Sequence, residues 1–215
     1  MPPLSHPTRP SSSFASPAVA GSITVSIVEN DTDLCESLQA VLNSEPGFQC
    51  VSVHHSAEDA LARLPRLKPV VVLLDLYLPG LSGSDCVRKL RARLRKSKIL
   101  VLTIEDQAEA IFKTLKAGAD GYLEKPVPLA GVMEAIRRIH AGDAPMSPQI
   151  ARLVLKSFHK RGQASQELTT LTAREEQVLA SLAEGRTYKE MAGQLGIGAQ
   201  TVNDHVKHIY EKLHV

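Results

Sequence analysis

The most constraining feature of this sequence is the regular alternation of short apolar runs with amphipathic helical patterns between residues 23 and 140. Apolar runs with strand character occupy residues 23–28, 48–53, 70–75, 98–103 and 121–123. Helical patterns follow them at residues 33–43, 57–64, 84–95, 107–117 and 128–140. Strands that alternate with helices are joined by right-handed crossovers, which place helices on both faces of a parallel sheet. The sequence therefore predicts an α/β fold with a doubly wound, five-stranded parallel sheet.

Polar side chains follow several of these strands at the point where each strand ends. The third run is apolar up to Asp75, which by itself could equally be the cap of a turn before Pro79 and Gly80. The corresponding residues at the ends of other strands are Glu29, Asn30, Asp31, Thr103 and Lys125. The carboxyl ends of parallel strands meet at one edge, where ligands of such sheets bind. We therefore expect these side chains to share one crevice.

An acidic crevice of this kind predicts phosphoryl chemistry. Carboxylate and amide oxygens are suited to Mg²⁺, and the ion together with Lys125 could neutralise a phosphoryl group moving onto Asp75. Taken singly, these residues also have structural interpretations. Thr103 could be an ordinary strand residue, Lys125 a solvated charge and Tyr122 a core aromatic.

Several motifs occur here in a fixed order: Glu29-Asn30, Leu74-Asp75, Leu78-Pro79-Gly80 with Gly83, Val101-Leu102-Thr103, and the stretch from Ala117 to Pro126. On these motifs, the region from Ile23 to Ala141 resembles the flavodoxin-like receiver domain of bacterial two-component response regulators. The resemblance implies that a histidine kinase phosphorylates Asp75. It further implies a switch pair of Thr103 and Tyr122, a phosphate contact from Lys125, and a cis bond before Pro126. The implied metal ligands are Glu29, Asn30, Asp75 and the backbone carbonyl of Tyr77.

Two residues depart from the family pattern. Asn30 stands where a second acid is usual, so we expect a lower affinity for Mg²⁺, and whether Asp31 compensates is left open. Ile104 is bulky where a small residue often follows the hydroxyl residue.

The end of the chain has an all-helical pattern. Thr172 with Glu175 and Thr187 with Glu190 form two capping-box sequences, each of which predicts a helix start. Gly185 and Gly196 stand where helices would stop. A third helix carries one apolar stripe, formed by Val202, Val206, Ile209 and Leu213. A helix, a glycine-containing turn and a second helix predict a helix-turn-helix.

This region resembles the LuxR-type helix-turn-helix of the NarL/FixJ subfamily, through Leu171–Leu179, Lys189–Ala192, Leu195–Ile197 and Thr201–Leu213. The helix from Ala199 would read DNA, with Gln200, Asn203 and Lys207 on its outer stripe, because amides and Lys can bond to base edges. The implied double-stranded DNA contacts are Lys189, Gln200, Thr201, Asn203, Asp204, Lys207 and His208. Family members continue with a further helix past the position of Val215, which is absent here, so either the chain is truncated or dimerisation relies on the receiver.

Charge gives weaker support for DNA binding. From Leu168 onward, five basic residues stand against six acidic ones, and the whole chain nets only +2. With the four basic residues and the one acid, Glu167, of the preceding segment, the net charge from Arg152 onward becomes +2. We therefore expect modest, salt-sensitive DNA affinity for a single copy and stronger binding by a homodimer formed on activation.

The expected organisation is a disordered leader (1–21), a receiver (22–141), a linker (142–167) and a DNA-binding domain (168–215). The leader is rich in Pro and Ser, and no run approaches the length of a membrane helix, so a cytoplasmic location and no membrane partner are expected. The three cysteines are far apart and odd in number, which argues against disulfides or a zinc site.

Three functions are compatible with the motifs. The first is a transcriptional regulator switched by phosphorylation of Asp75. The second is a receiver-type transcription factor regulated by partner binding or dimerisation without phosphate, which Asn30 favours. The third is an aspartate-nucleophile phosphatase, but such enzymes need an acid two residues after the nucleophile, where this chain has Tyr77. We therefore predict a protein that is not an enzyme.

Overall fold

The computed structural model describes residues 21–104, 107–162 and 171–213. The predicted disordered leader lies outside the described residues, apart from Gly21. Within the part of the chain that is described, no helix is both long and apolar enough to cross a membrane.

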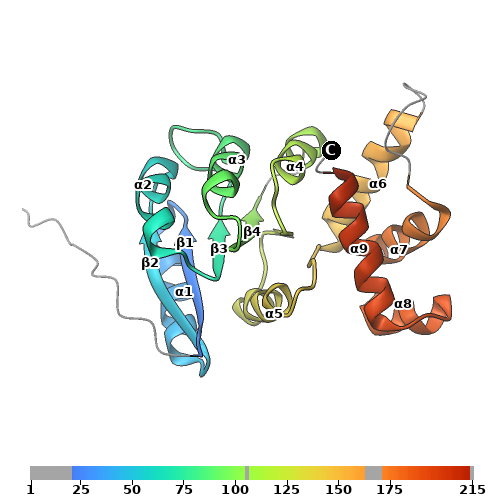
Figure 1. Cartoon of the computed structure of the whole chain (residues 1–215), viewed down its shortest axis with the longest axis horizontal. Helices are drawn as coiled ribbons and strands as arrows, with labels where there is room; N and C mark the ends of the chain where they lie inside the picture. The colour runs from blue at the N-terminus through green and yellow to red at the C-terminus, as the bar shows by residue number, and fades with distance from the viewer. Residues whose placement is uncertain (1–20, 105–106, 163–170, 214–215) are drawn as a thin grey trace, which may run out of the picture.

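Five parallel strands form a single sheet in the order β2-β1-β3-β4-β5. The strands are β1 (Ile23–Val28), β2 (Phe48–His54), β3 (Val71–Leu74), β4 (Lys98–Thr103) and β5 (Gly121–Glu124). Figure 1 shows the helices lying on both sides of this sheet. The predicted doubly wound α/β fold is therefore confirmed.

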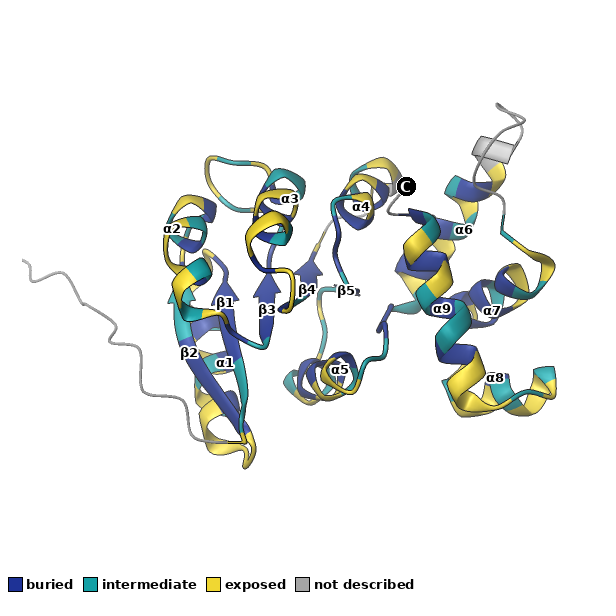
Figure 2. Cartoon of the chain, viewed as in Figure 1, coloured by how far each residue is buried: buried dark blue, intermediate teal, exposed yellow. Residues whose placement is uncertain are grey.

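Two helices cover one face of the sheet and three cover the other (Figure 1). The first pair is α1 (Thr32–Ser44) and α5 (Leu129–His140), and the second set is α2 (Ala57–Leu67), α3 (Gly83–Arg93) and α4 (Ala108–Lys116). Alternate residues of β3 enter the two cores, which explains why its whole length is apolar. Figure 2 shows the central strands in the buried class.

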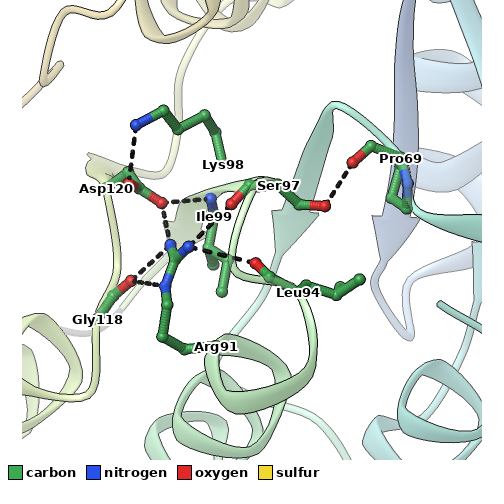
Figure 3. Close-up of polar contacts among 8 residues, drawn as sticks. All are labelled: Pro69, Arg91, Leu94, Ser97, Lys98, Ile99, Gly118 and Asp120. Carbon is green, nitrogen blue, oxygen red and sulfur yellow. Dashed lines mark hydrogen bonds and ion pairs between the residues drawn. The ribbon is translucent and has the colours of Figure 1, made fainter. Parts of the chain in front are cut away.

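An ion-pair network at the amino-terminal ends of β4 and β5 fixes the start of β5 (Figure 3). The carboxylate of Asp120 accepts hydrogen bonds from the backbone N–H of Ile99 at 2.8 Å, from Lys98 Nζ at 3.2 Å and from the guanidinium of Arg91. Arg91 Nε also donates to Gly118 O at 3.0 Å. Gly118 has a φ of +105°, and a Cβ there would lie 2.9 Å from Arg91 Cγ. Glycine is therefore required where α4 turns into β5.

The carboxyl-terminal part is helical, with α6 (Pro148–Gly162), α7 (Ala173–Ala183), α8 (Tyr188–Leu195) and α9 (Ala199–Leu213). Both predicted capping boxes are present, at the starts of α7 and α8. Gly196 ends α8 with a φ of +64°. The apolar stripe predicted on α9 is fully buried at Val202, Val206, Ile209 and Leu213. Sequence therefore predicted these helices and the core-facing side of α9 correctly.

The predicted linker contains α6, which packs against both α4 and α7. The rings of Phe112 on α4 and Phe158 on α6 meet edge to face, with centroids 6.0 Å apart. One apolar cluster runs from the sheet through these helices into the carboxyl-terminal domain. The two domains are thus joined by a shared core, and Figure 1 shows α9 lying beside α4.

Candidate phosphorylation site and DNA-reading helix

Asp75, directly after β3, lies in a small cluster of buried charges. Its backbone N–H donates to Val28 O at 2.9 Å, which holds it at the carboxyl end of the sheet. Lys125 Nζ donates to Asp75 Oδ2 at 3.0 Å and to Glu29 Oε2 at 2.6 Å. The side chains of Glu29, Asp75 and Lys125 are 5%, 6% and 16% exposed. The structure therefore brings together three residues that lie far apart in the sequence.

Burial and charge shift the ionisation of this cluster in definite directions. Burial raises the pKa of Glu29, and the charge of Asp75 adds to the rise, while hydrogen bonds from Lys125 and from the backbone of Asp31 oppose it. Burial lowers the pKa of Lys125, but its hydrogen bonds to Glu29 and Asp75 outweigh this effect, so that the pKa is raised. Lys125 is consequently a cation next to Asp75 at neutral pH.

The strands beside Asp75 carry the other residues singled out in the receiver. Thr103 ends β4, is fully buried, and accepts a hydrogen bond at its carbonyl from Lys125 N at 2.7 Å. The bond between Lys125 and Pro126 is cis, as the resemblance implied. Tyr122 is fully buried in β5. Its backbone pairs with the linker, since Tyr122 N donates to Pro145 O at 2.9 Å and Ser147 N donates to Tyr122 O at 3.1 Å.

The residues after β1 divide between the cluster and the helix that follows. Asn30 is exposed. Asp31 caps α1, with its Oδ1 accepting from Leu34 N at 3.0 Å. Ile104 is 61% exposed and Tyr77 is 48% exposed. The amide of Tyr77 donates to Asp75 Oδ1 at 3.2 Å, which places its backbone against the carboxylate.

The residues around Asp75 offer the kind of ligand that a hard divalent cation prefers, because Glu29 and Asp75 supply oxygen atoms from two buried carboxylates. Asn30 can supply an amide oxygen but no charge. Among the described residues, no group of three or more His, Cys, Asp or Glu side chains could hold a metal ion. The set is thus poorer in negative charge than one with a second adjacent acid.

Helix α9 faces the receiver and the linker along one stripe, which corrects the predicted position of Asn203. That residue is only 3% exposed and does not lie on an open outer stripe. Lys207 Nζ lies 3.9 Å from where a Cβ on Gly142 would stand, and Tyr210 OH donates to Pro145 O at 3.1 Å. The receiver and the linker together thus bury a second stripe of α9.

The other residues predicted to contact DNA are more exposed to solvent than Asn203. The exposed ones are Lys189, Gln200, Thr201 and His208. Asp204 is partly buried and accepts a hydrogen bond from Gln200 Nε2 at 3.1 Å.

Sequence reasoning missed the residues that join the domains. Tyr188 OH donates to Ala144 O at 3.1 Å, and the guanidinium carbon of Arg138 lies 4.3 Å from the centre of the Tyr188 ring. Tyr210 makes the equivalent contact from α9. The available signal was that two of the chain's four tyrosines occur in the short helix-turn-helix segment. Tyrosines of this kind often bury their rings while the hydroxyl finds a partner.

Two family models match the chain. The response regulator receiver domain matches residues 25–137, and the luxR family of bacterial regulatory proteins matches residues 169–215. A nitrate/nitrite response regulator protein homolog of Haemophilus influenzae is 32% identical over 191 residues, which cover 89% of this chain and 90% of that protein. The response regulator GacA of Pseudomonas aeruginosa is 33% identical over 191 residues, covering 88% and 89%.

Solved structures of two-component response regulators are also similar to this chain. A LuxR-family two-component response regulator from Aurantimonas sp. is similar with a TM-score of 0.59 and 28% identity, over 63% of this chain and 97% of that one. The response regulator ChrA of a haem-sensing two-component system has a TM-score of 0.52 and 28% identity, over 91% and 92%. With a receiver fold followed by a LuxR-type helix-turn-helix, this chain belongs to the family of two-component transcriptional response regulators.

Proposed function

We propose that this regulator is switched by transfer of a phosphoryl group from a histidine of a sensor kinase to Asp75. An Asp75 carboxylate oxygen attacks phosphorus, a P–O bond forms, the P–N bond to the donor imidazole breaks, and the imidazole nitrogen keeps the electron pair. The observation that supports this most is the position of Lys125, 3.0 Å from Asp75 Oδ2. Its ammonium group can follow the negative charge onto the phosphoryl oxygens.

Glu29, Asn30, Asp75 and the backbone carbonyl of Tyr77 would hold Mg²⁺. When bound, the ion would supply further positive charge for the phosphoryl oxygens. Because position 30 carries no charge, we propose weaker metal binding than in a receiver with two adjacent acids. Lys125 then carries more of the electrostatic work, and Glu29, which accepts a hydrogen bond from its Nζ at 2.6 Å, holds the ammonium group in position.

We propose that the switch reaches the DNA-binding domain through β5. The added charge of roughly −1.5 to −2 on Asp75 would draw Thr103 inward and let Tyr122 follow. A shift of Tyr122 acts on the linker directly, because their backbones are hydrogen-bonded at Pro145 and Ser147. The linker in turn holds α9 through Tyr210.

Release of α9 would uncover its receiver-facing stripe for DNA. We propose that Lys189, Gln200, Thr201, Asn203, Asp204, Lys207 and His208 contact double-stranded DNA in the released state. A homodimer would then place two recognition helices on half-sites about one helical turn apart. Because the DNA and the kinase's phosphorylated domain are there, we propose that the protein works in the cytoplasm.

The experiment is incubation of the full chain with phosphoramidate or acetyl phosphate and Mg²⁺, followed by intact-mass measurement. We expect a gain of one phosphoryl group in the wild type and in Asp33→Asn, an exposed acid of α1. Asp75→Ala should show no gain. An unmodified wild type, or an unchanged gain in Asp75→Ala, would contradict the phosphorylation step.

A second candidate is a regulator that works without phosphate. It is favoured by Asn30, which is exposed and uncharged where the family usually has an acid. In that case the binding of a partner molecule, instead of phosphorylation, would break the hydrogen bonds from Tyr188 to Ala144 and from Tyr210 to Pro145. Operator binding measured with and without phosphodonor separates the two, because only the first function predicts tighter binding with the donor. We propose no enzymatic role, since Tyr77 stands where a phosphatase of this chemistry needs an acid.

A further inference from the structure

A cavity of about 530 Å³ lies between the two domains, at α5 and the segment after it on one side and the starts of α8 and α9 on the other. Its polar lining includes Arg138, Asp143, Arg186, Lys189, Gln200 and Asn203. The volume falls in the range of roughly 300–1,000 Å³ that small-molecule sites occupy. Both domains supply side chains, so any occupant would touch the receiver and the DNA-reading helix together.

Asn203 lines the cavity and is almost fully buried. Asn203 is 3% exposed, and within the described residues its Oδ1 has no hydrogen-bond partner. A buried amide oxygen in this condition costs free energy, and such groups usually mark a missing ligand or water. The side-chain amide also carries an NH₂ group, which is a donor and therefore suits an anion. Asn203 therefore offers a hydrogen-bond donor at the wall of the cavity.

The charges around the cavity favour an anion. Its lining has three cationic side chains and one acidic side chain. Arg138 is paired with Asp143 at 3.2 Å and Arg186 with Glu184 at 2.8 Å. Lys189 makes no ion pair with any residue of the described ranges. The cavity thus has an excess of positive charge.

The start of α9 adds to this preference. Ala199 and Gln200 line the cavity, and the first turn of the helix contains no acidic residue. Gly198, which precedes the helix, has no side chain to cap its amides. Uncapped first-turn amides and the helix dipole attract negative charge. The backbone, Lys189 and Asn203 therefore act in the same direction.

We infer that this interdomain cavity binds a small oxyanion, either an organic phosphate or a carboxylate, held by Arg138 from the receiver and by Lys189 and Asn203 from the DNA-binding domain. The site is separate from Asp75 and requires no phosphorylation. Because the anion bonds to both domains, it stabilises their docked arrangement and opposes DNA binding. This last effect rests on the proposed DNA-binding function, whereas the binding itself does not.

The test is calorimetric titration of the unphosphorylated full chain with inorganic phosphate and, separately, with citrate. Both titrations are made at constant ionic strength in chloride, with EDTA to remove metal ions from Asp75. We expect saturable binding of at least one of the two probes. Phosphate alone would identify the phosphate class, and citrate alone the carboxylate class. Absence of saturable binding for both at millimolar concentration would overturn the inference.

Substitutions locate the site. Arg138→Gln removes the charge from the receiver side and should weaken binding at least about tenfold, because a charge-assisted hydrogen bond is lost. Lys189→Gln, at an exposed position, should weaken it as well. The control is Arg137→Gln, the neighbouring residue on α5, which is paired with Glu45 away from the cavity. Equal affinities in the wild type and in both test variants would refute the site.

DNA binding provides the second readout. The anion should lower the operator affinity of the wild type and of Asp75→Asn, because two ligands that favour different states oppose each other reciprocally. Arg138→Gln should still bind DNA but lose this sensitivity. If the anion weakened DNA binding equally in Arg138→Gln, it would merely compete with DNA phosphates, and the interdomain site would be refuted. A failure of Asp75 to accept phosphate would leave these results unchanged.

Discussion

Tyr122 of the receiver and Tyr210 of the DNA-reading helix donate hydrogen bonds to the same atom, the carbonyl oxygen of Pro145. The backbone N–H of Tyr122 lies 2.9 Å from it and the hydroxyl of Tyr210 lies 3.1 Å from it. Burial raises the pKa of Tyr210 well above its ordinary value, so the hydroxyl stays protonated and remains a donor. The edge of the sheet and the recognition helix are therefore joined through one acceptor.

Tyr210→Phe should make DNA binding easier before any phosphorylation. The change removes one hydrogen bond from the docked state, about 1 kcal/mol, and roughly a fivefold gain in operator affinity is expected. Fluorescence anisotropy with a labelled operator measures the effect. Tyr188→Phe removes the separate bond to Ala144 O and should act in the same direction. Unchanged DNA affinity in both variants would mean that these bonds do not hold the helix back.

Gly121→Ala should disturb the contact between β5 and the linker. A Cβ at this position would lie 2.8 Å from Leu100 Cδ1 and 2.9 Å from Pro145 Cγ, so one neighbour must move. A loss of about 1–3 kcal/mol in the free energy of unfolding is expected, measured by urea denaturation. The control is Gly193→Ala in α8, where no atom lies within 4 Å of the new Cβ. That variant should be slightly more stable than the wild type, since alanine is the better helix former.

Asp120→Ala should destabilise the receiver without touching Asp75. The change leaves the N–H of Ile99 without its acceptor and removes the carboxylate that pairs with Arg91 and Lys98 at the start of β5 (Figure 3). A loss of about 2 kcal/mol in unfolding free energy is expected, because hydrogen-bonding groups in a partly buried site lose their partner. Urea denaturation checks this, with the exposed Asp33→Ala as the control. Equal stability of the two variants would show that the network contributes little.

Glu175 should make the stability of the carboxyl-terminal domain depend on acid pH. Although burial raises the pKa of this carboxylate, hydrogen bonds from Lys212 and from Thr172 outweigh it and lower the pKa below 4.5. The stabilisation is therefore present above pH 4.5 and is lost as the pH falls through the folded-state pKa. In Glu175→Gln the loss of stability below pH 4.5 should be smaller than in the wild type.

Thermal unfolding followed by circular dichroism between neutral and acid pH provides the measurement. The control is Glu176→Gln, since the neighbouring carboxylate is half exposed and its pair with His159 contributes little. A pH dependence in Glu175→Gln that matches the wild type would contradict the role assigned to Glu175.

Local patterns predicted most of the fold, because each signal acts within a few residues. The apolar run before Asp75 predicted a doubly covered strand, and Thr187 with Glu190 predicted a helix start that the structure confirms. The convergence of Glu29, Asp75 and Lys125 also followed from sequence, since strand ends in a parallel sheet must meet.

The position of Asn203 could not be predicted in this way. Helical periodicity distinguishes the core stripe of α9 from its outer side, but it does not show that another domain covers part of the outer side. The role of the Asp31 carboxylate could not be predicted for a similar reason, because a carboxylate at a helix start can either cap the helix or turn toward a metal. Only the hydrogen bond to Leu34 N distinguishes the two.

The edge-to-face rings of Phe112 and Phe158 make separation of the domains costly for a solitary molecule. When α6 leaves α4, both aromatic faces meet water, and that exposure is relieved if a second molecule covers the surface vacated on α4. The active form would then accumulate with the square of protein concentration. The concentration of the regulator in the cell would thereby set how strong a signal must be before the regulator binds DNA.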